Sequence, residues 1–167
     1  MPANATINVG DTVVHPHHGV GTVTALDTVD LGAGPVPYVT ISVDGGLTLK
    51  VPAATLSDHG IREPVTEKRA EEILAVLTQP AAEDPGHAVR RRRDADKLAS
   101  GKLVECAEVV RDTAAVIAAH AKGGADADRN LLSNAKTQLA QELAVALGST
   151  PEEAMARVEA QLKSRND

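Results

Sequence analysis

The sequence has almost no aromatic side chains: its 167 residues include one Tyr and neither Trp nor Phe. Any hydrophobic core must therefore be built from Val, Leu, Ile and Ala. The shortage also bears on nucleic-acid binding, because base stacking and the wedging of DNA steps commonly use large side chains.

Cysteine and long apolar runs are scarce as well. The single cysteine, Cys106, excludes an internal disulfide and a cysteine-rich zinc site. No apolar run reaches the roughly 18 residues that suggest a membrane-spanning helix, and residues 1–6 do not resemble a signal peptide. These absences predict a cytoplasmic protein with no membrane partner.

Positive charge is not in excess either. The formal net charge of −6 argues against bulk electrostatic binding to DNA, so any nucleic-acid contact needs a local patch. The candidate patch is the run 90–93 with Lys97, in which Arg90, Arg93 and Lys97 share a helix face at spacings i, i+3 and i+7. This face either contacts DNA phosphates or is a solvated face that pairs with nearby acids such as Asp94.

The chain changes character near residue 65. Before it, β-branched residues alternate with polar ones and turn signals are frequent, with Asp44-Gly45 as a strong hairpin signal. Strands are expected at Val13–Val14, Val20–Leu26, Tyr38–Val43 and Leu47–Val51. Several short strands in about 55 residues predict a small, strongly bent antiparallel β-barrel.

After residue 65 the apolar residues recur every three or four positions, which predicts helices. The expected helices cover residues 65–79, 87–100, 103–121, 126–147 and 150–162, and a flexible loop is expected near 79–86. The predicted fold class is therefore α+β with two modules, a small β-barrel over 1–64 and an all-α helical bundle over 65–167.

Three histidines, His15, His17 and His18, raise the question of a metal site. A structural zinc site needs four ligands that converge in space, and Pro16 with the adjoining turn would separate these side chains. We therefore interpret them as turn histidines and expect no metal. Cys106 lies within an apolar helical stripe, where a free cysteine behaves as a small hydrophobic residue.

No constellation for catalysis is present in the sequence. We find no paired acid and base, no nucleophile motif and no cofactor-binding loop. The sequence therefore predicts a protein that is not an enzyme, with no cofactor and no small-molecule substrate.

Three motifs, in matching order and spacing, resemble the CarD/CdnL family of bacterial transcription regulators. The segment 9–21, VGDTVVHPHHGVG, is similar to the family's opening, and 47–52 is similar to the strand before its helical domain. Residues 97–101 and 107–112 closely resemble the helical domain of actinobacterial CarD. The same opening occurs in the transcription-repair coupling factor, but this sequence lacks the phosphate loop of that protein's motor.

The resemblance implies a function and its partners. CarD proteins have an N-terminal Tudor-like barrel that binds the β subunit of RNA polymerase, and a helical domain that lies near the upstream edge of the melted promoter. The implied polymerase-binding residues are Lys50, Val29 and Val51, with edge-strand addition as a possible mode. The implied DNA contact is to the backbone and minor groove, weak without polymerase, and modulates open-complex stability.

The sequence departs from the family at the predicted DNA site. Relatives carry a Trp at the start of the basic helix, whereas His87 and Ala88 stand there in this chain. Because neither offers the area of a Trp wedge, we expect weaker open-complex stabilisation. The alternative is a divergent polymerase-bound adaptor or antagonist with little DNA-wedging activity. At the polymerase site, Val29 replaces a basic residue of some relatives, and Lys50 stands where Arg is common.

Overall fold

The computed structural model describes residues 6–165 and divides the chain into two compact units, 1–64 and 65–167. The N-terminal unit holds four strands and a short 3-10 helix, and the C-terminal unit holds five α-helices. The predicted α+β class with two modules is confirmed. Among the described residues, no helix combines the length and the apolar character needed to cross a bilayer.

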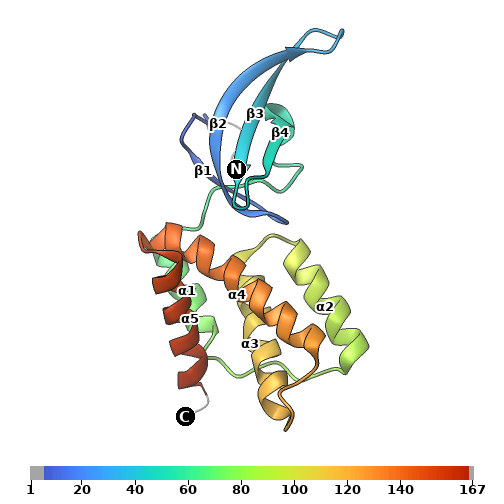
Figure 1. Cartoon of the computed structure of the whole chain (residues 1–167), viewed down its shortest axis with the longest axis vertical. Helices are drawn as coiled ribbons and strands as arrows, with labels where there is room; N and C mark the ends of the chain where they lie inside the picture. The colour runs from blue at the N-terminus through green and yellow to red at the C-terminus, as the bar shows by residue number, and fades with distance from the viewer. Residues whose placement is uncertain (1–5, 166–167) are drawn as a thin grey trace. The chain divides into compact units, whose positions relative to one another are not determined.

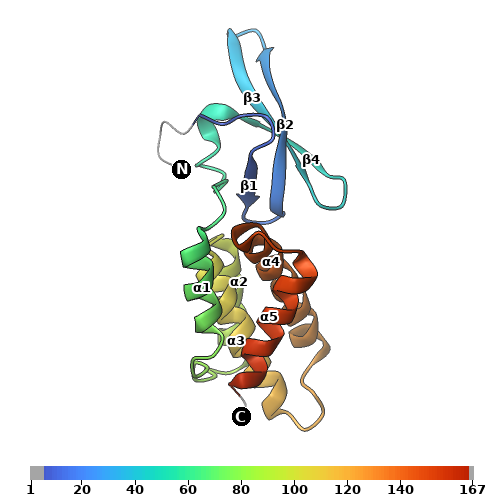
Figure 2. The ribbon, with the colours of Figure 1, turned by 90° about the vertical axis from the view of Figure 1, so that its left-hand side faces the viewer.

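The strands form one antiparallel sheet in the order β1-β2-β3-β4 (Figures 1 and 2). They are β1 (Thr12–His15), β2 (Gly19–Asp30), β3 (Pro35–Val43) and β4 (Thr48–Pro52), followed by the 3-10 helix η1 (Ala53–Thr55). Alternate residues of the strands point to one face and bury a core of small aliphatic side chains. That core consists of Val13, Val23, Val39, Ile41, Val43, Leu56 and Ile61.

In the residues that it describes, the structure does not show the closed barrel that the sequence predicted. Among residues 6–165, β1 and β4 do not pair, so the sheet is not closed. The outer edge of β1 is instead covered at one point by Arg62, whose backbone exchanges two hydrogen bonds with Val14, at 2.7 and 3.1 Å. In the described part of the unit, β4 pairs with β3 on one side and its outer edge has no pairing partner.

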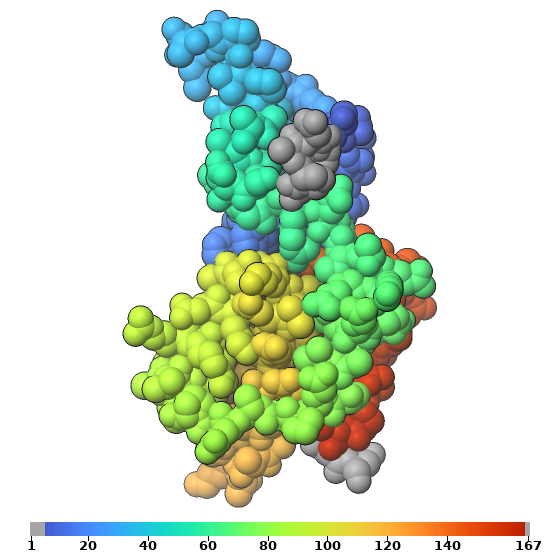
Figure 3. All heavy atoms as spheres, turned by 180° about the vertical axis from the view of Figure 1, so that it is seen from behind, coloured from blue at the N-terminus to red at the C-terminus, as the bar shows by residue number. Residues whose placement is uncertain are grey.

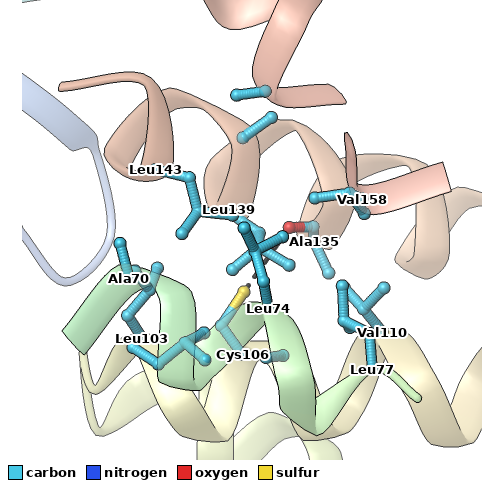
Figure 4. Close-up of a cluster of buried hydrophobic side chains, with 14 of the residues drawn as sticks. Ala70, Leu74, Leu77, Leu103, Cys106, Val110, Ala135, Leu139, Leu143 and Val158 are labelled. Atoms are coloured by element: carbon cyan, nitrogen blue, oxygen red, sulfur yellow. Dashed lines mark hydrogen bonds between the residues drawn. The ribbon is translucent and has the colours of Figure 1, made fainter. Parts of the chain in front are cut away.

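The helical unit is built around a second core. Its helices are α1 (Glu67–Val76), α2 (His87–Ala99), α3 (Leu103–Ala119), α4 (Asp126–Leu147) and α5 (Pro151–Ser164). Figure 4 shows aliphatic side chains of α1, α3, α4 and α5 meeting in this core. The chain's Ala-rich stripes let these helices approach closely, with Ala70, Ala107 and Ala140 among the buried residues.

Local signals place several helix ends. The Thr66 hydroxyl accepts a hydrogen bond from the Arg69 backbone N–H at the start of α1. At the start of α5, Thr150 and Glu153 form a reciprocal capping box, and Pro151 is the first helical residue. Gly148 ends α4 in the left-handed conformation, with φ 63°, which costs glycine little.

Candidate functional site

Strand β4 presents the edge of the N-terminal sheet and carries Lys50. The Lys50 ammonium lies 3.1 Å from the Asp27 carboxylate, and both side chains are about half exposed. An exposed pair of this kind contributes little stability, about 0–1 kcal/mol, so its partners can exchange at low cost. The edge therefore combines unpaired backbone groups with a charge that a partner can reach.

The other two predicted polymerase-binding residues lie in different settings. Val51 is partly buried and packs against the N-terminal core, so it supports the sheet. Val29 is also partly buried and lies opposite Val36 in the β2–β3 pairing. The structure thus brings Lys50 and Val51 onto one strand and places Val29 in a separate ribbon.

That ribbon is the part of β2 and β3 that pairs with no other strand. Residues 28–30 and 35–37 pair only with each other, because β1 reaches 22 on β2 and β4 reaches 38 on β3. Its tip exposes Leu31, at 75%, and the Asp30 carboxylate accepts hydrogen bonds from two glycine N–H groups of the turn. A two-stranded ribbon is marginally stable alone, and an apolar tip on it suits contact with a partner.

In the helical unit, the predicted DNA-contact face of α2 is turned inward. The Arg90 guanidinium is 2.7 Å from Asp84 and 3.1 Å from Asp128, and the residue is 4% exposed. Burial alone would lower the pKa of Arg90, but its two carboxylate partners raise the pKa above the ordinary value. Arg90 is therefore not placed for direct contact with DNA, contrary to the expectation.

The two other cations of that face are also engaged. Arg93 donates to Asp94 at 3.2 Å and lies 3.9 Å from Asp112, and Lys97 is 2.6 Å from Glu108. The spacing i, i+3 and i+7 did place the cations on one face of α2. That face lies against α3 and α4, because their carboxylates neutralise it.

The outer face of α2 carries the remaining cations. Arg91 and Arg92 are exposed and form no ion pair among residues 6–165, and α2 lies on the outside of the helical unit (Figure 3). His87 and Ala88 are exposed at the start of the helix, beside Val89 at 59%. Sequence reasoning missed Arg91 and Arg92 as the accessible pair. The sequence of α2 carried a signal for this arrangement: it has no apolar stripe, so some of its charged residues had to form the inward face.

The turn histidines form a small cluster at the end of β1. The ring of His15 is 4.7 Å from that of His18 and 5.9 Å from that of His17 between centroids. The His15 Nδ1 accepts a hydrogen bond from the His17 backbone N–H at 3.1 Å, which occupies one possible ligand atom. Among the described residues no group of three or more potential ligands is arranged to hold a metal.

This cluster makes the N-terminal unit sensitive to acid. Burial, followed by the charges of His18, His17 and His59, lowers the pKa of His15 below its ordinary 6.5. Since the unfolded chain takes up this proton at higher pH than the folded chain, the free energy of unfolding should fall as the pH drops through 6.5. Urea titrations between pH 8 and pH 5, followed by Tyr38 fluorescence, would measure the fall.

The His15→Gln variant provides the control, because it removes the titrating group and keeps a polar side chain. The difference in stability between the unaltered chain and this variant should depend on pH only below about 7. A difference that stays constant down to pH 5 would show that the His15 proton is not linked to folding.

Cys106 has no reactive setting. Its thiol is buried in the helical core and donates a hydrogen bond to the Ala135 carbonyl at 3.4 Å. Burial, followed by the charge of Glu142, raises the pKa of the thiol to about 12. The thiolate needed for nucleophilic or redox chemistry is therefore scarce at neutral pH, and the residue acts as part of the core.

Comparison with family models matches both units. The model described as "CarD-like/TRCF RID domain" matches residues 7–65, and the model described as "CarD, C-terminal domain" matches residues 72–159. RID denotes an RNA polymerase-interacting domain. The two matches follow the division between the β-rich unit and the helical unit.

Two individual proteins are also similar to this chain in sequence. The chain is 28% identical over 145 residues to the Bacillus subtilis (strain 168) protein named "Putative transcription factor YdeB", covering 85% of this chain and 93% of that protein. It is 30% identical to the 72-residue N-terminal domain of Myxococcus xanthus CarD, solved by NMR in solution, covering 38% of this chain and 89% of that domain. The TM-score for that structure is 0.31.

Proposed function

Because the chain belongs to the CarD family of transcription regulators, which are not enzymes, we propose that it binds the RNA polymerase β subunit through its N-terminal unit and contacts promoter DNA through α2. The observation that carries the proposal is the match of residues 7–65 to a polymerase-interacting domain. The helical unit then acts on DNA that polymerase has already bound.

The polymerase contact is proposed at the open edge of β4. An extended segment of the partner can add to this edge, with main-chain hydrogen bonds supplying affinity and side chains supplying specificity. Lys50 is half exposed on β4 and its bond to Asp27 is weak enough to be exchanged for a carboxylate of the partner. The ribbon that carries Val29 and the exposed Leu31 is a second contact.

The DNA contact is proposed at the outer face of α2. Arg91 and Arg92 are free to meet phosphates, with His87 and Ala88 beside them at the start of the helix. Two phosphate contacts give weak binding in a chain of net charge −6. Tethering to polymerase raises the local concentration of α2 near the promoter, which compensates for that weakness.

A second candidate function is a polymerase-bound adaptor or antagonist that leaves open complexes unchanged. It is favoured by the ion pairs of Arg90, Arg93 and Lys97, which engage three of the five cations of α2 with carboxylates of the chain itself. His87 and Ala88 favour it too, since neither side chain offers the area of a Trp wedge.

The polymerase contact is tested by co-purification with bacterial core polymerase. The Lys50→Glu variant should bind about tenfold more weakly if Lys50 contacts a carboxylate of the polymerase. The double variant Asp27→Lys/Lys50→Glu is the matched control, because it restores the pair within the sheet with its charges exchanged. Recovery of binding in the double variant would confine Lys50 to a role within the sheet. No association of the unaltered chain would overturn the proposal.

The DNA contact is tested in the same complex by the lifetime of open promoters. The unaltered chain should prolong that lifetime, and the double variant Arg91→Ala/Arg92→Ala should lose the effect. Equal lifetimes with and without the unaltered chain would decide for the adaptor function. If the double variant prolongs the lifetime of open promoters as much as the unaltered chain does, the DNA contact lies elsewhere.

A further inference from the structure

Helix α2 is attached to the helical unit differently from the other four helices. The buried residues of α2 are Arg90 and Asp94, whereas α1, α3, α4 and α5 each bury aliphatic side chains. No buried member of the hydrophobic core comes from α2, and only Leu98 packs against that core from the side. Since burial of apolar surface is the main force that holds helices together, α2 lacks the usual source of docking energy.

Ion pairs supply the attachment instead. Arg90 pairs with Asp84 and Asp128, Arg93 with Asp94 and Asp112, and Lys97 with Glu108. Two of these pairs reach α3 and one reaches α4. Pairs of charges removed from water gain little net stability, because desolvation offsets most of their attraction.

The ionic attachment is also incomplete. The Asp94 Oδ2 and Asp112 Oδ2 atoms are buried and form no hydrogen bond in the described structure. Burial raises the pKa of the Asp94 carboxyl, opposed by its bond to Arg93. Buried carboxylate oxygens without a donor are costly, and undocking α2 would return both to water.

The helix itself is weakly supported. Gly86 precedes α2 with φ 94° and provides no side-chain cap, and the first turn contains no acidic residue. Of the arginines at 90–93 only Arg90 reaches the first turn, where the helix dipole disfavours positive charge, whereas Lys97 in the last turn is favourably placed. Weak capping and the lack of an apolar stripe together predict a helix of low local stability.

We propose that α2 opens independently of the core formed by α1, α3, α4 and α5, and that the carboxylates of Glu108 and Asp128 hold it in a docked state that withholds its inner cations from DNA. The carboxylates occupy the positions that DNA phosphates would occupy on the same cations. The docked helix offers Arg91 and Arg92, and the opened helix offers five cations. The withholding of cations from DNA rests on the proposed DNA contact, whereas the opening of α2 does not.

The opening is tested on the full chain by amide hydrogen exchange, which needs no DNA. Amides of 91–99 should exchange faster than those of the core helices, and faster still at high salt, which screens the partly exposed Lys97–Glu108 pair. Glu108→Gln should speed exchange in α2 about threefold, and Asp128→Asn about 100-fold. The matched control is Glu159→Gln, which breaks the Lys136–Glu159 pair between α4 and α5. Exchange of α2 at the rate of the core helices would overturn the proposal.

The withholding of cations is tested with a duplex of about 30 base pairs at low salt. Glu108→Gln should bind the duplex about threefold more tightly than Glu159→Gln, although both variants change the net charge equally, and its salt slope should be larger by about 0.9. Equal affinities of the two variants would overturn the withholding while α2 still opens. Absence of DNA binding by every variant at low salt would also overturn the withholding, whereas the proposed DNA contact is decided by the open-promoter lifetimes of the polymerase complex. The hydrogen-exchange test of α2 opening does not depend on either outcome of the DNA-binding test.

Discussion

Replacing Leu139 with Ala should lower the free energy of unfolding of the helical unit by about 2–5 kcal/mol. Leu139 of α4 is fully buried, and Figure 4 shows it among Leu74 of α1, Val110 of α3 and Val158 of α5. A core without aromatic rings relies on aliphatic contacts, and removing one large side chain leaves a cavity that the helices cannot fill. Far-UV circular dichroism at 222 nm during urea unfolding would measure the loss.

The matched control is Val145→Ala, which lies on the same helix and is 42% exposed. That change should alter stability by no more than about 0.5 kcal/mol. Tyr38, the one aromatic residue besides the histidines, lies on β3 of the other unit, so its fluorescence should report an unchanged transition in Leu139→Ala. A shift of the Tyr38 transition by the same amount would show that the two units unfold together.

The helices that bury apolar stripes could be predicted from the sequence. Their spacing of three and four, the capping box at Thr150 and the glycine at 148 are local signals, and the structure places helix ends near them. The strands were predicted for the same reason, through alternation and the Asp44-Gly45 turn. In each case the physical cause lies within a few residues of the chain.

The orientation of α2 could not be predicted in this way. Its cations were correctly placed on one face, but that face is turned inward only because Glu108, Asp112 and Asp128 lie opposite it. These carboxylates lie 11 to 38 residues along the chain from the cations they pair with. No local sequence pattern predicts such a pairing. The barrel was overpredicted for a similar reason, since closure depends on contact between the first and last strands.

The second large effect on stability is expected at Gly21, where β2 and β3 approach closely. A Cβ atom on Gly21 would lie 2.7 Å from Ile41 Cγ2 and 2.8 Å from Val43 Cγ1. Gly21 has no positive φ, so a glycine-to-alanine change in this strand would ordinarily be stabilising by about 0.5–1 kcal/mol. The steric conflict reverses the sign, and Gly21→Ala should destabilise the N-terminal unit by about 3 kcal/mol.

The double variant Gly21→Ala/Val43→Ala decides whether crowding is the cause. Val43→Ala alone should be destabilising because Val43 is buried, yet it removes one of the two methyl groups that oppose a Cβ at position 21. The two changes should therefore cost less together than the sum of their separate effects, by about 1 kcal/mol. Tyr38 fluorescence during urea unfolding would measure all three variants. Additive losses would mean that the strand shifts to accept the methyl group, and then the closeness of β2 to β3 does not explain the glycine.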